Sequence, residues 1–311
     1  MARRWGFAML KEMIDRYLEL RHMAGFEMKV DRGLLHNFAR FAGDRSETHV
    51  RRQTAIDWAA AAPSPAQREC RLGMVRRFAD HARAEDSAHE AVPSKVFVST
   101  TRRRPFPYIF SPEELLQLLD ATAELKPKAS LRPLTYYTLF GLLATTGMRI
   151  SEATHLMIDD VTNDGLIIRQ TKFRKSRMLP LHETTQAALT HYLRQRQSTA
   201  GGDSHVFIST KGCTLTYAMV HGTFRYLLKR IPLRLKPGQR PGIHGLRHRY
   251  AVRALESCPV GYDHAARHIL ALSTYLGHTH VADTYWYLQT TPHLMTAIAD
   301  ACELFIRGEK A

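Results

Sequence analysis

One group of side chains between residues 149 and 287 has the residue types needed to cut a phosphodiester without a metal. A phenol can become covalently linked to phosphorus, and guanidinium groups match a phosphate geometrically. Imidazole and ammonium groups can move protons at both ends of an in-line displacement. The group comprises one tyrosine, two histidines, two arginines and one lysine: Tyr287, His244, His278, Arg149, Arg247 and Lys172.

The two arginines are the expected ligands of the phosphate. The transition state of phosphoryl transfer carries negative charge on its non-bridging oxygens, and a guanidinium presents paired donors in a rigid fork that fits them. His244 precedes Arg247 by three residues, so on a helix both side chains lie on one face. We therefore expect His244 and Arg247 to reach the same phosphate, together with Arg149.

The tyrosine needs a proton acceptor. An unperturbed tyrosine has a pKa of about 10, so the phenol must lose its proton as it attacks at neutral pH. His244 is the predicted base. Tyr275 and Tyr285 stand close to Tyr287 in the sequence, and the residue types alone leave the choice among the three tyrosines open.

The overall charge predicts a polyanionic partner. The chain has 44 Lys and Arg residues against 29 Asp and Glu residues, which gives a formal net charge of +15. A charge this large on a folded chain favours nucleic acid, and we expect double-stranded DNA. A length of 311 residues exceeds the usual size of one domain, so two domains with separate cores are predicted.

The cysteines and the first residues indicate the compartment. Cys70, Cys213, Cys258 and Cys302 are far apart and form no Cys-x-x-Cys pair, which fits a reduced cytosol. Charged residues between positions 11 and 16 interrupt the apolar positions that a signal peptide needs, and no segment is long enough to span a membrane. The sequence predicts a cytoplasmic, nucleoid-associated protein without a membrane partner.

Residues 1–95 are predicted to form a helical DNA-binding domain. Apolar residues recur at helical spacing in residues 8–25 and 34–41, and Ser64-Pro65 is typical of a helix start. About four helices are expected between residues 8 and 88. Arg76 and Arg77 belong to a set of arginines that would contact the DNA backbone, although a solvated basic surface would give the same pattern.

Residues 96–107 are predicted to be a basic linker. The helical period disappears there, and prolines flank Arg102, Arg103 and Arg104, which we expect to contact phosphates. A second domain, residues 108–311, begins with a capping box at Ser111-Pro112-Glu113-Glu114. Its predicted elements include a buried helix that stops at Gly147, two strands at 165–172 and 177–181, and a third short strand at 205–209. The expected fold is mainly α with a small antiparallel sheet.

Five segments of the second domain resemble, in order, the motifs of the tyrosine recombinase (phage integrase) family. Residues 146–152 resemble the first-arginine motif, and residues 171–181 resemble the β-hairpin that carries the lysine. His244-Gly-Leu-Arg247-His248 is similar to the His-x-x-Arg box, and residues 276–278 to the penultimate box. Tyr287 occupies the position of the nucleophile. The match covers roughly residues 108–300, and the first half resembles the core-binding domain of the family in organisation only.

The resemblance implies a role for each matched side chain. It selects Tyr287 over Tyr285 and Tyr275, and it makes Lys172 the acid that protonates the departing 5′ oxygen. Lys175 is the rival acid, but its simpler role is a DNA contact, as for Arg174. By resemblance, His278 donates a hydrogen bond to a non-bridging oxygen or to the phenol, and Glu152 supports the site. The resemblance also implies that a terminal helix at 293–307 docks in a neighbouring subunit, although its apolar stripe would equally fit a helix that caps its own domain.

Two departures from the family pattern indicate a divergent branch. Gly245 stands where relatives commonly carry an aspartate, so the support of that carboxylate is missing or comes from elsewhere. The interval between Arg247 and His278 is longer than usual, with residues 258–265 as the insertion. Residues 283–288, followed by Pro292, look like recombinases of transposon-like or integrative elements.

We expect neither a metal nor a cofactor. His278, His280 and Asp283 could be offered as metal ligands, but a relaxase site has a hydrophobic residue between its histidines, whereas Thr279 is polar. The sequence also has no cluster of carboxylates suited to two-metal catalysis.

The expected protein is a C-shaped clamp on DNA that cuts and rejoins strands through a 3′-phosphotyrosyl intermediate and a Holliday junction. The resemblance implies a homo-tetramer on paired DNA sites, with or without sister recombinases, that integrates or excises a mobile element. One alternative is a type IB topoisomerase-like enzyme, which reseals the same strand. Another is a catalytically idle DNA-binding accessory of the same fold.

Overall fold

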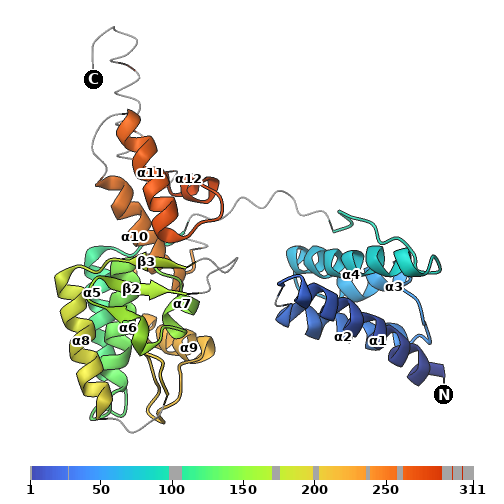
Figure 1. The fold of residues 1–311 in the computed structure, drawn as a ribbon, viewed down its shortest axis with the longest axis horizontal. Coiled ribbons are helices and arrows are strands. Elements are labelled where there is room, and N and C mark those ends of the chain that lie inside the picture. Colours follow the sequence, from blue (N-terminus) through green and yellow to red (C-terminus); the bar gives the residue numbers. More distant parts are fainter. Residues whose placement is uncertain are drawn as a thin grey trace. The chain divides into compact units, whose positions relative to one another are not determined.

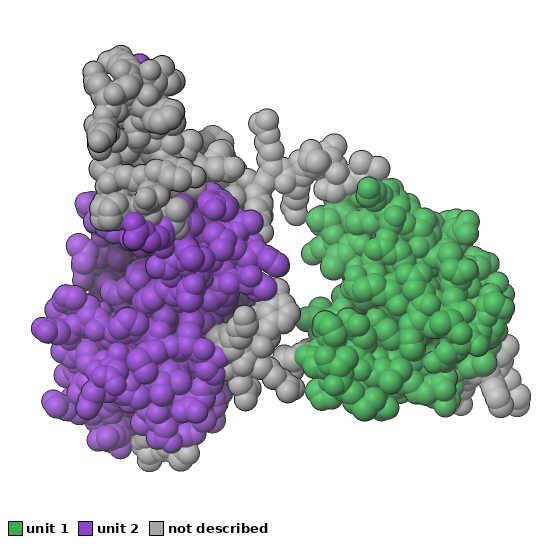
Figure 2. All heavy atoms as spheres, turned by 45° about the horizontal axis from the view of Figure 1, so that its top comes forward, with its two compact units in different colours: residues 1–104 green, residues 105–311 purple. Residues whose placement is uncertain are grey.

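The computed structural model describes residues 2–26, 28–97, 107–169, 176–198, 203–235, 239–257 and 262–288, together with residues 296 and 303. The chain divides into two compact units, Met1–Arg104 and Pro105–Ala311 (Figures 1 and 2). The division lies inside the segment 96–107 that the sequence indicates as a linker. Each unit has its own hydrophobic core.

The described part of the first unit contains four helices, as predicted. These are α1 (Ala2–Met23), α2 (Lys29–Gly43), α3 (Arg52–Ala60) and α4 (Pro65–Glu85). Leu10, Leu35 and Phe38 are fully buried between them. The predicted start of α4 is confirmed, because the Ser64 side chain accepts a hydrogen bond from the backbone N–H of Gln67 at 3.3 Å.

The second unit is mostly helical, with a small sheet. In chain order its helices are α5 (Pro112–Asp120), η1 (Ala121–Glu124), α6 (Arg132–Thr146), α7 (Ile150–Thr154), η2 (Ile158–Asp160), α8 (Glu183–Gln197), α9 (Tyr217–Leu228), α10 (His244–Glu256), α11 (Tyr262–Leu276) and α12 (Ala282–Leu288). Helices α10, α11 and α12 lie together at one end of the unit (Figure 1). None of the helices in the described part of the chain is long and apolar enough to cross a membrane.

Two local features place the first arginine of the site. The capping box at Ser111 is present and starts α5. Helix α6 ends at Gly147, which adopts a left-handed conformation with φ of 61°. A Cβ at this position would also lie 2.5 Å from the ring of Tyr250, so glycine is required here for both reasons. The turn at Gly147 brings Arg149 back towards α10.

Among the residues that the structure describes, the sheet has three antiparallel strands in the order β1-β2-β3: β1 (Val161–Thr162), β2 (Gly165–Ile168) and β3 (Arg177–Leu179). The hairpin is the predicted one with shorter strands, and Ile168 pairs with Arg177. The predicted third strand at 205–209 is wrong, since this segment makes only isolated bridges among the described residues. Val206, Phe207 and Ile208 are all buried in succession, so the alternation of a one-sided strand is absent.

Candidate active site

The two predicted phosphate-binding arginines lie at one turn of the chain. Arg247 donates hydrogen bonds to the carbonyl oxygens of Gly147 at 2.7 Å and Leu276 at 2.8 Å. Arg149 donates to the carbonyl oxygen of Gly277 at 2.8 Å. Consecutive carbonyls at the end of α11 therefore orient both guanidiniums, and carbonyls orient a guanidinium without neutralising its charge.

Arg247 is the more deeply buried of the two arginines, with an exposed fraction of 2%. Burial and the nearby charge of Arg149 lower the pKa of Arg247 to about 10, so it stays positive at neutral pH. A desolvated cation interacts strongly with any anion that reaches it, because the local dielectric is low. This arrangement suits a phosphate.

Glu152 connects the first arginine to the β-hairpin. Its carboxylate accepts hydrogen bonds from the backbone N–H and the guanidinium of Arg149, at 2.8 and 2.9 Å, and from both terminal nitrogens of Arg177, at 3.0 and 2.8 Å. Burial opposes ionisation of Glu152, but the bonds and charges of Arg177 and Arg149 outweigh it and lower its pKa. The carboxylate is thus charged and holds both arginines in place.

Arg177 is a residue to which the sequence analysis assigned no role. It is the first residue of β3, and its Nε also donates to the carbonyl oxygen of Tyr275 at 2.8 Å. Its guanidinium packs over Gly277, where a Cβ would lie 2.9 Å from one of its nitrogens. The sequence feature that could have pointed to Arg177 is its place directly after the basic turn of the lysine hairpin. Arg177 fixes that hairpin against Glu152 and the end of α11.

Helix α10 carries three of the polar side chains on neighbouring turns. His244 and His248 are four residues apart, and their rings meet edge to face with centroids 4.5 Å apart. His244 is an exposed residue, although its ring lies against that of His248. Desolvation of the imidazole, followed by the charges of Arg247 and Arg149, lowers its pKa to about 4. His244 is therefore neutral at neutral pH.

Gly245 has a steric explanation. A Cβ at this position would lie 2.9 Å from the carbonyl oxygen of Tyr108 and 2.9 Å from the ring of Phe110. The segment before α5 thus occupies the space that an aspartate side chain would need. Support for α10 comes from this packing and from Arg249, which donates to the carbonyl oxygen of Phe110 at 2.5 Å.

His278 lies beside the tyrosine in a fixed orientation. Its Nδ1 is 2.8 Å from the hydroxyl of Thr284, a residue that is completely buried. The imidazole is nearly parallel to the Tyr287 ring, with an interplanar angle of 14° and centroids 6.2 Å apart. Burial and the charges of Arg247 and Arg149 lower the pKa of His278 to about 4, so it too is neutral at neutral pH.

Tyr287 is 3% exposed, but its hydroxyl faces polar groups. The Tyr287 Oη lies 3.3 Å from His248 Nδ1. Burial raises the pKa of the phenol, while the charge and hydrogen bond of Arg247 act in the opposite direction. Tyr285 is 52% exposed. Residues two positions apart in an α-helix differ by about 200° around the helix axis, so the two tyrosines leave α12 on nearly opposite sides.

Several predicted site residues lie outside the described part of the chain. These are Lys172, Arg174 and Lys175 of the hairpin and Arg102, Arg103 and Arg104 of the linker. Residues 258–261 of the predicted insertion and the predicted terminal helix, apart from residues 296 and 303, lie outside it as well. Arg76 and Arg77 are on α4 of the first unit. Arg77 is exposed and lies 3.9 Å from Asp31.

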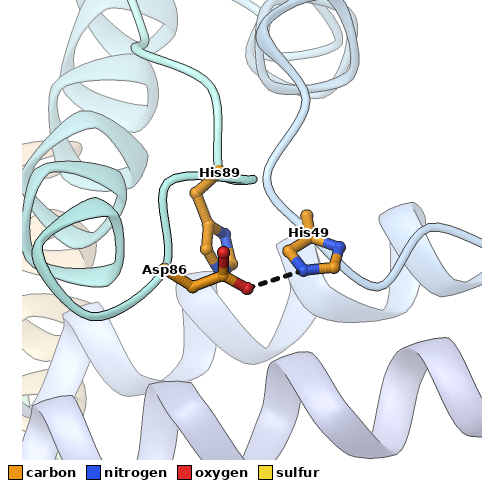
Figure 3. A group of neighbouring side chains, drawn as sticks. All are labelled: His49, Asp86 and His89. Atoms are coloured by element: carbon orange, nitrogen blue, oxygen red, sulfur yellow. Dashed lines mark hydrogen bonds and ion pairs between the residues drawn. The ribbon is translucent and has the colours of Figure 1, made fainter.

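One group of metal-ligating residue types gathers in the first unit. His49, Asp86 and His89 offer ligand atoms that lie within 4.8 Å of one another (Figure 3). Asp86 contacts His49 Nε2 at 3.0 Å, and the His89 ring is buried. Within the described residues, the alternative set His278, His280 and Asp283 does not gather in this way.

The hydrogen bond of His89 argues against metal binding by this group. The backbone N–H of Val50 donates to His89 Nδ1 at 3.0 Å, so a neutral ring carries its proton on Nε2. A metal at Nε2 would require the proton to move to Nδ1, where it would face the Val50 N–H. The group instead attaches the segment after α4 to the segment before α3, together with Glu90, which accepts from the backbone N–H of Arg52 at 2.8 Å.

Comparison with known proteins agrees with this geometry. A putative integrase/recombinase of Sinorhizobium fredii, y4rB, is 37% identical over 298 residues, which cover 92% of this chain and 94% of the relative. A second one from the same organism, y4rE, is 35% identical over 94% of this chain and 95% of the relative.

The fold is that of solved recombinases. The integrase of the Tn1549 transposon, in complex with transposon right end DNA, superimposes with a TM-score of 0.65 and 17% identity over 95% of this chain and 99% of that one. Residues 109–293 match the phage integrase family, which covers the arginines, the histidines and Tyr287. The chain therefore belongs to the phage integrase family, whose members are tyrosine recombinases.

Proposed function

We propose that this recombinase cuts duplex DNA with Tyr287 and holds the cut strand as a 3′-phosphotyrosyl intermediate. The observation that carries the proposal is the position of the Tyr287 hydroxyl. It lies beside His248 and the buried Arg247, and the same turn at residues 276–277 orients Arg149. A phosphate bound by both guanidiniums would be within reach of that hydroxyl.

Each side chain of the site has a role in this mechanism. Arg149 and Arg247 bind the non-bridging oxygens and stabilise the charge of the transition state. His244 and His278 are neutral at neutral pH, so each can donate a hydrogen bond to a phosphate oxygen or take up a proton. Lys172 protonates the departing 5′ oxygen. The P–O5′ bond breaks as the bond to Tyr287 forms.

The phosphotyrosyl bond conserves the energy of the phosphodiester, so no nucleotide is consumed. The free 5′ hydroxyl of a partner duplex attacks this bond, which gives a Holliday junction. Exchange between two sites needs four active subunits, so the assembly is a tetramer with the terminal helix docked between neighbours. Arg76, Arg77, Arg102, Arg103, Arg104, Arg174 and Lys175 contact the DNA backbone, and the action takes place at the nucleoid.

The biological role is the movement of an integrative or transposon-like element. The likeness to y4rB and y4rE, two putative integrase/recombinases of one organism, supports the participation of sister recombinases. The similarity of fold to an integrase that binds transposon right end DNA supports a mobile element.

A covalent trap tests the nucleophile without knowledge of the target site. Sheared DNA from the source genome, nicked at random, is incubated with the protein, and DNA attached to protein is recovered after denaturation. We expect the recovered 3′ ends to be blocked by a peptide after proteolysis, and the 5′ ends to be free hydroxyls. Sequencing of the blocked ends then gives the cleavage site.

Tyr287→Phe and Tyr285→Phe form a matched pair for this trap. We expect Tyr287→Phe to give no adduct, whereas Tyr285→Phe, which changes an exposed ring on the same helix, keeps the wild-type yield. Adduct formation by Tyr287→Phe would show that another residue is the nucleophile.

A second measurement distinguishes recombination from resealing of one strand. Two duplexes that carry the identified site and different end labels are mixed with the protein. A recombinase produces four-way junctions and duplexes with exchanged labels, while a type IB topoisomerase-like enzyme relaxes supercoiled plasmid and exchanges nothing.

A further inference from the structure

We propose that His248 is a catalytic residue that accepts the phenol proton of Tyr287 during attack and returns it when the strand is resealed. The inference rests on the proposed function, because it names the proton acceptor of that same site. His248 lies next to Arg247 in the sequence and had no role in the sequence analysis, which predicts His244 as the base.

The contact to the reacting atom supports His248. Its Nδ1 lies 3.3 Å from the Tyr287 Oη, and the two rings are tilted by 57° with centroids 5.4 Å apart. When the ring proton is on Nε2, the Nδ1 lone pair accepts the phenol O–H. A general base must lie within hydrogen-bond reach of the proton that it removes, and such contacts are often longer before the substrate binds than in the complex. At 3.3 Å, His248 needs only a small shift to reach this distance.

The fold fixes His248 in this position. It is on α10, four residues after His244, and its ring is packed edge to face against the His244 ring. Arg247, the residue before it, is anchored by the carbonyls of Gly147 and Leu276. One rigid helix thus holds the phosphate with one side chain and contacts the nucleophile with the next, so the two reacting groups are aligned together.

The other two imidazoles of the site are less suited to this step. Desolvation of the imidazoles and the nearby guanidiniums make both His244 and His278 weak proton acceptors, each with a pKa of about 4. His278 Nδ1 is also engaged with the Thr284 hydroxyl. These two residues are better placed to donate hydrogen bonds to phosphate oxygens.

Cleavage and resealing each move two protons and exchange one P–O bond for another. As the Oη–P bond forms, the phenol proton moves to His248 Nδ1, the P–O5′ bond breaks, and the 5′ oxygen takes a proton from Lys172. During resealing the 5′ hydroxyl attacks phosphorus, its proton returns to the lysine, and the departing Tyr287 oxygen regains its proton from His248. The two half-reactions use the same pair of groups, as microscopic reversibility requires.

The test uses His248→Asn in the full chain. An asparagine side chain can place an acceptor oxygen near the position of Nδ1, but it cannot take up a proton. On a nicked duplex carrying the cleavage site, at saturating protein, we expect adduct formation to slow by about 10²-fold to 10⁴-fold. Resealing of a preformed adduct should slow as well, while the affinity for DNA stays within about twofold. His244→Asn is the comparison variant.

A second change separates proton transfer from positioning. 3,5-Difluorotyrosine in place of Tyr287 gives a more acidic phenol that depends less on a base. With this nucleophile, the ratio of the wild-type rate of adduct formation to the His248→Asn rate should fall by at least about tenfold. The reason is that the more acidic phenol loses its proton more easily without a base. A variant that merely displaces the ring would keep the same ratio with both phenols.

Each outcome decides the inference. A His248→Asn rate within about threefold of wild type would overturn it, as would a slow rate that difluorotyrosine does not restore. If difluorotyrosine restores the rate of His244→Asn and not that of His248→Asn, His244 is the residue that accepts the phenol proton. If wild type itself forms no adduct, the proposed function falls, and this inference falls with it.

Discussion

The two units of the molecule each contain a histidine cluster, and the clusters differ in what their ring nitrogens contact. In the first unit, His89 Nδ1 accepts a backbone N–H from Val50, and His49 contacts Asp86. In the second unit, His248 Nδ1 lies against the Tyr287 hydroxyl, on the same helix as the buried Arg247. The first cluster joins two chain segments, while the second faces a reactive group.

The charge around an imidazole distinguishes these two roles better than its burial does. Burial lowers the pKa of His89 and is also the largest cause of the low pKa of His278. The second cause differs between them. It is the neighbouring His49 for His89, but the guanidiniums of Arg247 and Arg149 for His278. A site that gathers fixed positive charge is suited to binding an anion. A histidine cluster that accepts a hydrogen bond from a backbone N–H is suited to stabilising the fold.

The largest effect that this comparison predicts is the loss of catalysis in Arg247→Lys. A lysine keeps the charge but cannot bridge the carbonyls of Gly147 and Leu276 and still present a paired donor to phosphate. We expect the single-turnover rate of adduct formation to fall by about 10²-fold to 10³-fold.

The matched control for this variant comes from the first unit. His89→Asn keeps an acceptor for the Val50 N–H and should leave the rate at saturating DNA unchanged. Equal losses in both variants would mean that the two clusters do not differ in role.

The second effect is on the stability of the catalytic unit. Glu152→Ala leaves the nearly buried Arg177 without its carboxylate, and removing one partner of a buried ion pair costs about 3–5 kcal/mol. We expect faster hydrogen exchange in peptides that cover α7 and the β-hairpin, with peptides of α1–α4 unaffected. A double variant, Glu152→Gln with Arg177→Met, should recover part of this protection; if it recovers none, the ion pair is not the cause.

The sequence was sufficient for the residues that a local pattern specifies. The starts of α4 and α5 follow from Ser64 and Ser111, and the end of α6 follows from Gly147, because a cap or a left-handed turn needs only neighbouring residues. The ordered motifs likewise indicated the family. These signals depend on residue type and short spacing.

The sequence was insufficient where distant segments meet. Arg177 binds Glu152 across 25 positions, and His248 meets Tyr287 across 39, so no local spacing reveals either contact. Gly245 has its explanation in the closeness of Tyr108 and Phe110, again a tertiary contact. The supposed strand at 205–209 failed for the same reason, since core packing buries three successive residues there.

A smaller effect is expected from His89→Leu. This change leaves the buried Val50 N–H without an acceptor, which costs about 1–3 kcal/mol. The measurement is hydrogen exchange of peptides that span residues 44–62 and 86–92 in the full chain. Because His89→Asn retains the acceptor, it should lose clearly less protection than His89→Leu, and equal losses would assign the effect to packing alone.

The smallest effect is a dependence of stability on pH in the first unit, which should be stronger in wild type than in the His89→Asn variant. Burial lowers the pKa of His89 below its ordinary value of 6.5. The unfolded chain therefore binds a proton more readily than the folded unit below that pH, and acid favours unfolding. We expect the protection of wild-type residues 44–62 to decline between about pH 7 and about pH 5.5, and to decline less in His89→Asn.

Asp86 does not contribute in this window, because hydrogen bonds from the Ala88 N–H and from His49 lower its pKa from 3.8, so its protonation matters only at more acidic pH. A decline of the same size in both proteins would show that His89 is not the titrating group.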